Sequence, residues 1–273
     1  MPADQRPPST GRVSGWRPGT GPTLEEAAEL LATRELVIEG RLPWSSNLTF
    51  LVSLEGTGDP PSDDDPAGDG DPGGNGPVQA VYKPHRGEQD LWDFPDGLYR
   101  REVAAHRLSE ALGWGVVPPT VVRDDAPFGT GSVQLFVAAD YEQHYFTLFE
   151  EGDREDELQV FCAFDVVANN ADRKSGHVLL DAGGRLWGID HGLCFHVHHK
   201  LRTVIWDFAG EHVPDHLVAD LQRLVATGLP ADLEELLSGA EAEALLERAA
   251  RLAATGVFPE PVGDRPPYPW PLV

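Results

Sequence analysis

The chain has 273 residues, with 21 Lys and Arg against 45 Asp and Glu, which gives a formal net charge of −24 and a sequence pI near 4.6. This acidity argues against a nucleic-acid-binding scaffold and against anionic membrane surfaces, because both would repel the chain. No apolar run approaches the roughly 18 residues of a membrane span, and the N-terminus has no apolar signal segment. Only two cysteines, Cys162 and Cys194, are present. We therefore expect a reduced cytoplasmic protein without integral membrane association.

The first half of the chain is predicted to be rich in strands. Residues 1–22 contain many Pro, Gly and Ser and are predicted to form a disordered tail. Thr23 and Glu26 have the spacing of a capping box, which predicts a helix to about residue 34. A second helix is predicted over residues 99–112, closed by Gly113. Apolar and β-branched runs predict five strands, at residues 36–38, 47–54, 78–83, 120–123 and 132–137.

Two runs carry much of the negative charge. Residues 55–77 hold seven acids and no base among many Pro and Gly, which predicts a disordered insertion in a hairpin whose role the sequence leaves open. Residues 140–157 hold eight acids and one Arg. Each run has a net charge of −7, so together they account for −14 of the −24. The remaining body is only moderately acidic.

The second half is predicted to be mostly helical. A helix is expected over residues 156–169, two short strands at 177–180 and 185–189, and mainly helices over 204–254. The pattern favours an α+β protein with a small β-rich N-lobe, residues 23–137, and a mostly helical C-lobe, residues 138–254, with a cleft between them. Residues 255–273 form a Pro-rich tail.

Three segments have residue types that suit phosphoryl transfer from a nucleotide. Lys83 ends the third predicted strand, and Glu102 lies on the helix after it. A strand lysine held by a helix glutamate is the ion pair that positions nucleotide phosphates in kinases. The alternative is a surface lysine and a solvated helix face.

The loop between the first two strands is the second segment. Ser45, Ser46 and Asn47 carry hydroxyl, amide and backbone N–H groups that suit the cradling of phosphate oxygens. The loop lacks a glycine-rich phosphate signature, so an ordinary polar hairpin turn is the alternative.

The third segment is the most informative. Asp172 is followed five residues later by His177, and Asp190 stands shortly before Gly192, beyond a predicted hairpin. Kinases place a catalytic aspartate and a metal ligand at the first spacing and a second metal-binding aspartate before a glycine. Two unrelated aspartates in turns are the alternative.

These motifs resemble the phosphatidylinositol 3- and 4-kinase superfamily, nearest to type II phosphatidylinositol 4-kinases and more distantly to HipA-like toxin kinases. The resemblance runs from about residue 40 to residue 208. The matching segments are Ser45–Phe50, Tyr82–Pro84, Arg101–Leu108, Gly113–Pro118, Gly131–Val137, Asn170–Arg173 and Ile189–Gly192.

The resemblance implies a bilobal, phosphatidylinositol-kinase-like fold that uses ATP and Mg²⁺. Lys83 would contact the phosphates, with Glu102 holding it, while Asp172 would be the catalytic aspartate and Asp190 a metal ligand. The segment Gln134, Leu135, Phe136 and Val137 would border adenine and offer its exposed backbone edge to it.

The sequence departs from the family at the metal site and beside the catalytic aspartate. His177 stands where the family has a metal-binding Asn; because Mg²⁺ prefers oxygen ligands, Mn²⁺ is the alternative metal. Lys174 could neutralise a transferring phosphoryl group, or be a solvated loop lysine. His191 replaces a small or aromatic residue.

Three functions follow from this pattern. The first is an ATP-dependent kinase whose hydroxyl acceptor is a protein or a small molecule rather than an inositol lipid, since no basic docking surface is visible. The second is a catalytically weak pseudokinase or nucleotide-binding module, favoured by His177. The third is a metal-dependent hydrolase that uses the histidines of residues 194–199, for which a substrate-contacting segment is the alternative reading.

Overall fold

The computed structural model describes residues 16–19, 21–43, 47–57, 77–261 and 266–272. Its contacts divide the chain into two compact units. Unit 1 comprises residues Met1–Gln89 and Pro119–Ala138, and unit 2 comprises Asp90–Pro118 and Ala139–Val273. Residues 90–118, which the sequence placed in the N-lobe, thus group with the second unit.

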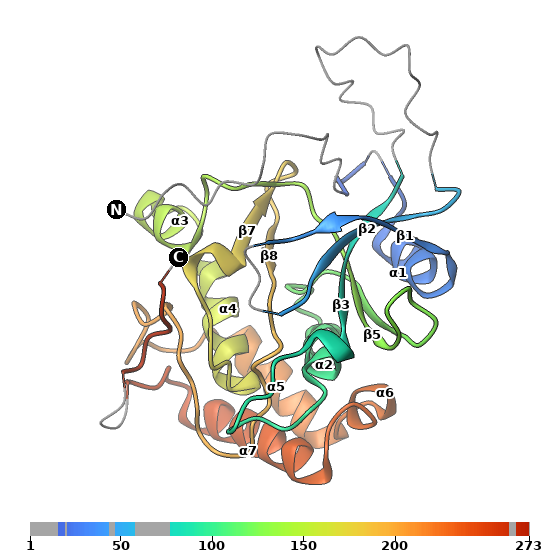
Figure 1. Cartoon of the computed structure of the whole chain (residues 1–273). Helices are drawn as coiled ribbons and strands as arrows, with labels where there is room; N and C mark the ends of the chain where they lie inside the picture. The colour runs from blue at the N-terminus through green and yellow to red at the C-terminus, as the bar shows by residue number, and fades with distance from the viewer. Residues whose placement is uncertain (1–15, 20, 44–46, 58–76, 262–265, 273) are drawn as a thin grey trace. The chain divides into compact units, whose positions relative to one another are not determined.

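Unit 1 is built on one antiparallel sheet whose strands follow the order β1-β2-β3-β5-β4 (Figure 1). The five predicted strands are therefore confirmed, with small shifts at their ends. Its elements are α1 (Leu24–Thr33), β1 (Leu36–Arg41), β2 (Phe50–Leu54), β3 (Gln79–Pro84), the 3₁₀ turn η1 (His85–Gly87), β4 (Thr120–Arg123) and β5 (Gly131–Leu135).

Helix α1 closes one side of the unit 1 core. It begins with the predicted capping box between Thr23 and Glu26, and its Ala27 and Leu31 are fully buried beside the sheet. The guanidinium of Arg123, on β4, donates at 2.8 Å to the carbonyls of Leu31 and Arg34. A cation at a helix C-terminus satisfies unpaired carbonyls there, so this contact fastens α1 to the sheet.

Unit 2 contains most of the helices and a small sheet of order β6-β7-β8. Its elements are α2 (Leu98–Leu112), β6 (Ala139–Asp140), α3 (Tyr145–Glu151), α4 (Glu155–Ala168), the 3₁₀ turn η2 (Ser175–His177), β7 (Val178–Asp181), β8 (Leu186–Gly188), α5 (Asp215–Thr227), α6 (Ala231–Glu234) and α7 (Gly239–Thr255).

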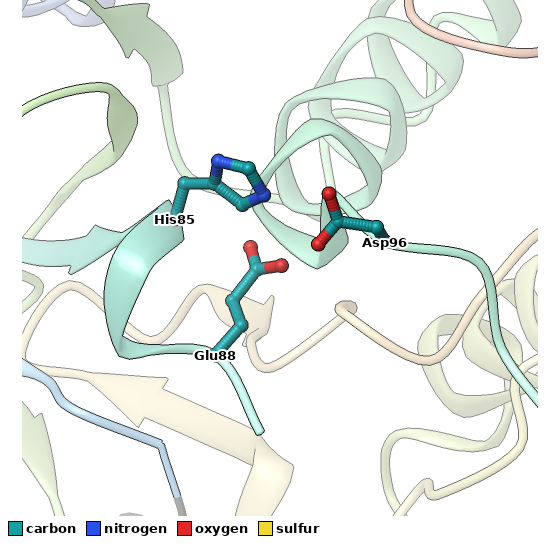
Figure 2. A group of neighbouring side chains, drawn as sticks. All are labelled: His85, Glu88 and Asp96. Atoms are coloured by element: carbon teal, nitrogen blue, oxygen red, sulfur yellow. The ribbon is translucent and has the colours of Figure 1, made fainter. Parts of the chain in front are cut away.

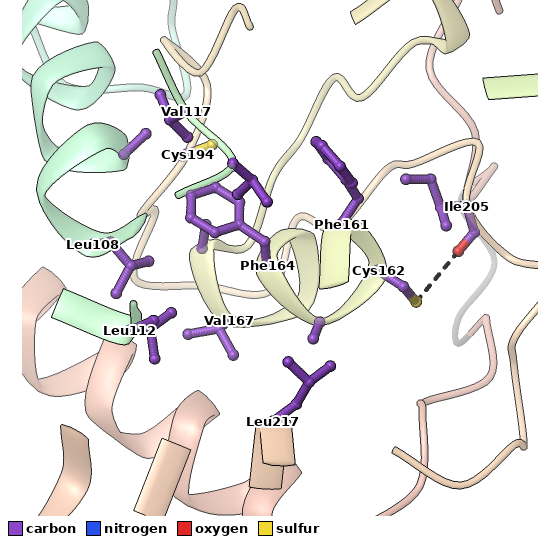
Figure 3. Packing of buried hydrophobic residues seen from close by; sticks show 14 of the residues in the cluster. Leu108, Leu112, Val117, Phe161, Cys162, Phe164, Val167, Cys194, Ile205 and Leu217 are labelled. Carbon is purple, nitrogen blue, oxygen red and sulfur yellow. Dashed lines mark hydrogen bonds between the residues drawn. The ribbon is translucent and has the colours of Figure 1, made fainter. Parts of the chain in front are cut away.

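Helix α4 lies at the centre of the unit 2 core. Figure 3 shows its Phe161 and Phe164 among Leu108 and Leu112 of α2 and Leu217 of α5. This apolar packing explains why α2 groups with unit 2. The Sγ of Cys162 lies 3.6 Å from the Ile205 carbonyl, and burial raises the pKa of this thiol.

Three segments differ from the sequence-based picture. Residues 140–157 contain a helix, α3, whose Tyr145 and Leu148 are buried while its acids face outward. The helices expected from residue 204 begin only at Asp215. The C-terminal segment is partly anchored, because Leu272 accepts from the Ser175 amide at 2.8 Å.

The N-terminal segment is also partly anchored. Trp16, inside the predicted disordered tail, forms a parallel bridge with Val137. The disorder predicted for residues 1–15 and for most of the acidic insertion, residues 58–76, lies outside the described residues. No helix in the described part of the chain is long and apolar enough to cross a membrane.

Candidate active site

A buried ion pair organises the loop that follows α4. The carboxylate of Asp165, in the last turn of α4, accepts hydrogen bonds from Nε and Nη2 of Arg173 at 2.9–3.1 Å. Neither side chain is exposed to solvent. Asp165 also accepts from Asn170 Nδ2 and Thr203 Oγ1, both at 2.9 Å. Asn169 ends the helix in a left-handed conformation, with φ of 53°. The chain therefore turns sharply and folds back onto its own helix.

Arg173 joins the two loops that the sequence singled out. Its Nη1 donates to the carbonyls of His177 at 3.3 Å and Ile189 at 3.1 Å. Its Nη2 lies 2.9 Å from Nε2 of His191. This one guanidinium, carried by the Asp172 loop, thus bonds to α4, to η2 and to the Asp190 loop, which fixes their relative positions.

Asp172 and Lys174 form a partly buried pair beside this network. Lys174 Nζ lies 2.7 Å from Asp172 Oδ2, and the Asp172 amide donates to Asn170 Oδ1 at 3.0 Å. Burial raises the pKa of Asp172 above its ordinary value; the Lys174 ammonium opposes this shift and the Asp190 carboxylate adds to it. A carboxylate with a raised pKa beside a cation suits the acceptance of a proton.

His177 and Asp190 lie close enough to share one ion. Nε2 of His177 is 3.5 Å from Oδ2 of Asp190, and the two side chains are 14% and 48% exposed. Neighbouring ligands at about 2.1 Å from an ion stand roughly 3 Å apart, so this separation fits a divalent metal. An imidazole paired with a carboxylate suits Mn²⁺ better than Mg²⁺. Asp190 has φ of 61°, a strained conformation typical of functional loops.

Glu102 contacts the second loop directly. It is 3% exposed on α2, and its Oε2 accepts from the His191 amide at 2.9 Å. A Cβ on Gly192 would lie 3.3 Å from Oε1 of the same carboxylate, so a glycine allows this close approach. The neighbouring Arg101 pairs with Glu241 of α7 and thereby ties α2 to the last helix.

The candidate nucleotide residues lie in unit 1. Lys83, on β3, is in register with Ser132 of β5. Because Lys83 and Glu102 belong to different units, their ion pair stays a prediction. Asn47 Oδ1 accepts from the Gln89 amide at 3.0 Å. Ser45 and Ser46 lie outside the described residues.

The segment expected to border adenine is already engaged within unit 1. The side-chain amide of Gln134 donates a hydrogen bond to Thr120 Oγ1 at 2.9 Å. The Leu135 amide donates to the Pro119 carbonyl at 2.8 Å. Phe136 and Val137 lie beside Trp16, whose backbone bonds to the Phe136 carbonyl and to the amide of the next residue, Ala138.

The remaining histidines form no three-ligand group in the described part of either unit alone. Figure 2 shows the side chains of His85 and Glu88, in unit 1, turned toward each other; the third residue drawn, Asp96, belongs to unit 2. Nδ1 of His196 accepts from the His198 amide at 3.0 Å, within the loop itself. Among the residues that the structure describes, the histidines of the loop at residues 194–199 thus belong to no three-ligand group.

Comparison with known proteins gives a family. No protein-family model matches the sequence. Protein Rv2133c of Mycobacterium tuberculosis (strain ATCC 25618 / H37Rv) is 37% identical over 282 residues, which cover 89% of this chain and 94% of that protein. The chain belongs to the Rv2133c family.

Solved structures were compared with this Rv2133c-family chain, and one of them gives its fold. A Golgi casein kinase matches 85% of the chain and 73% of its own length, with a TM-score of 0.52 and 14% identity. A Helicobacter pylori proinflammatory kinase, CtkA, matches 84% of this chain and 94% of its own length, with a TM-score of 0.44 and 10% identity. The α+β kinase-like fold, with one β-rich and one mostly helical part, is confirmed.

Sequence reasoning missed the residues that organise the site. Asp165 lies in an apolar helix and Arg173 in a polar loop, and nothing in the linear pattern pairs them. The helpful signal is chemical: a single acid among the buried apolar residues of a helix needs a partner. Arg173, eight residues later in a motif loop, is the nearest guanidinium.

Proposed function

We propose that this protein is an ATP-dependent phosphotransferase of the phosphatidylinositol 3-/4-kinase-like class, which transfers the γ-phosphoryl group to a hydroxyl acceptor. The observation that carries the proposal is the Asp165–Arg173 pair, whose guanidinium binds the loops of Asp172, His177 and Asp190 together. Phosphoryl transfer needs such fixed positions, because catalysis depends mainly on positioning and charge stabilisation.

Asp172 is proposed to accept the proton of the attacking hydroxyl. As the acceptor oxygen bonds to the γ-phosphorus, the bond from that phosphorus to the β–γ bridging oxygen breaks. ADP leaves with the bond's electron pair, and the hydroxyl proton moves to Asp172. Lys174, 2.7 Å from Asp172, would offset the negative charge of the transferring group.

His177 and Asp190 are proposed to hold the divalent ion, Mn²⁺ in preference to Mg²⁺. The bound ion would neutralise phosphate charge. Lys83, supported by Glu102, is proposed to bind the phosphates together with Ser45, Ser46 and Asn47. Residues 134–137 are proposed to border adenine.

The acceptor is proposed to be a protein or a small molecule in the cytoplasm. A net charge of −24 disfavours approach to an anionic membrane, which an inositol lipid kinase must reach. Both cysteines are buried free thiols, in keeping with a reducing compartment.

Nucleotide binding and turnover with each metal test the proposal. ATP binding and ADP release are measured with Mg²⁺ and with Mn²⁺ for wild type and Asp190→Asn, with the exposed Asp153→Asn as a matched control. We expect turnover in wild type and the control, faster with Mn²⁺, and a loss of at least about 100-fold in Asp190→Asn.

Other outcomes select the alternatives. ATP binding without turnover in any metal would favour a nucleotide-binding regulatory module. No ATP binding would exclude both nucleotide-based functions. Zinc that survives dialysis and is lost in His196→Ala would favour the hydrolase. Mass spectrometry of autophosphorylated protein, followed by a panel of protein and small-molecule hydroxyls, would identify the acceptor.

A further inference from the structure

The backbone of Trp16 is bound to the segment after β5, within unit 1. Its amide donates to the Phe136 carbonyl at 2.7 Å, and its carbonyl accepts from the Ala138 amide at 3.1 Å. The contact is an isolated parallel bridge rather than a strand of the sheet. The indole Nε1 donates to the Pro22 carbonyl at 2.8 Å, so the N-terminal segment folds over itself while it holds residues 136–138.

We propose that Trp16 is an intramolecular competitor of ATP, which holds the backbone of residues 136–138, at the end of the segment proposed to border adenine, until the nucleotide displaces it. This inference rests on the proposed function, since it assumes that residues 134–137 border adenine. It adds a regulatory role for a part of the chain that the site itself does not use.

Adenine and the Trp16 backbone offer the same hydrogen-bonding pattern. Adenine presents its 6-amino group, a donor, beside ring nitrogen N1, an acceptor. Trp16 presents its N–H and its C=O to the Phe136 carbonyl and the Ala138 amide, respectively. The Ala138 amide carries one hydrogen and serves one acceptor well, so adenine and Trp16 exclude each other.

The indole adds apolar contact to the two backbone bonds of Trp16. Trp16 is half-buried and packs against the apolar core of unit 1, which includes Tyr82 and Leu135. The core sheet does not depend on this contact, since β5 pairs with β3 and β4 on its own.

The inference predicts tighter ATP binding when the segment is released. Trp16→Pro removes the N–H that reaches Phe136, and a chain lacking residues 1–19 removes the segment altogether. The loss of one ordinary hydrogen bond in Trp16→Pro and of two in the truncated chain predicts an ATP dissociation constant lower by on the order of 10-fold in both. Arg17→Ala, which keeps the Trp16 backbone and changes an exposed neighbour, should bind ATP like wild type.

The experiment measures Mn-ATP binding by calorimetry for these four proteins, with thermal unfolding as the check on folding. Hydrogen exchange gives a second readout: ATP should speed exchange in the peptide that contains Trp16 in the wild-type chain. Equal or weaker ATP binding by the folded Trp16→Pro and truncated proteins, or slower exchange at Trp16 with ATP, would overturn this inference and leave the proposed function standing. If no protein binds ATP, the proposed function fails and this inference fails with it.

Discussion

The carboxylate of Asp172 experiences opposing influences that can be separated by mutation. Burial and Asp190 raise its pKa, while Lys174, 2.7 Å away, lowers it. In the proposed reaction only the ionised form accepts a proton, so the rate should fall as the pH drops through this pKa.

Lys174→Met should therefore move the acid limb of the pH–rate profile to higher pH. Removing the ammonium removes the influence that lowers the Asp172 pKa, so that pKa rises further. Lys174→Arg keeps the charge and should keep the limb near its wild-type position. Steady-state ADP release between pH 4 and pH 9 measures both, and an unmoved limb in Lys174→Met would count against Asp172 as the base.

The Asp165–Arg173 pair makes a stability prediction. Arg173→Met leaves the Asp165 carboxylate buried without its cation, which should lower the free energy of unfolding by about 3–5 kcal/mol. Asp165→Leu combined with Arg173→Met removes both charges and should lose less than the sum of the single changes. Urea unfolding measures wild type, Asp165→Leu, Arg173→Met and the double variant; additive losses would show that the two charges do not depend on each other.

At the scale of elements, helix α2 links two parts of unit 2. Arg101 pairs with Glu241 of α7, and Glu102 accepts from the His191 amide beside Asp190. The position of α2 therefore determines where the Asp190 loop lies. It also determines where Glu102, the proposed partner of Lys83, lies.

Glu102→Gln separates these two roles. The amide oxygen can still accept from His191, but the charge that would hold Lys83 is lost. We expect a melting temperature near that of wild type and a KM for ATP raised about 10-fold. Glu102→Ala, which loses both interactions, should also lower the melting temperature. An unchanged KM in both variants would contradict the proposed pair.

Local signals made some elements predictable and others not. Thr23 and Glu26 predict the start of α1, because a capping box is a contact between residues that are near neighbours in the sequence. Helix α3 was not predicted within its acidic run, since the burial of Tyr145 and Leu148 depends on contacts with apolar residues that are distant in sequence. The Trp16 bridge had no local signal, because it joins residues far apart in sequence.

The candidate site divides in the same way. Asp172, His177 and Asp190 were proposed from their spacing along the chain, and the structure places His177 next to Asp190. The buried partners Asp165 and Arg173 could not be, since their pairing depends on the fold of the loop after α4.

At the scale of the whole molecule, the uneven charge is the basis for the proposed soluble acceptor. The net charge of −24 is spread unevenly, with −14 in two runs that the sequence identifies. Vesicles that contain phosphatidylinositol should be phosphorylated at least about 10-fold more slowly than the best soluble acceptor, and added anionic lipid should slow the reaction further. Specific phosphorylation of such vesicles at a higher rate than that of the best soluble acceptor would contradict the proposed acceptor class.

The central claim is that Asp172 lies at the centre of a phosphotransfer site. Its most direct test compares wild type with Asp172→Asn, which keeps the shape of the side chain and removes its basicity. With Mn-ATP, the variant should bind nucleotide within about 2-fold of wild type, keep its melting temperature, and release ADP at least about 100-fold more slowly. Equal ADP release by the two proteins would contradict the account.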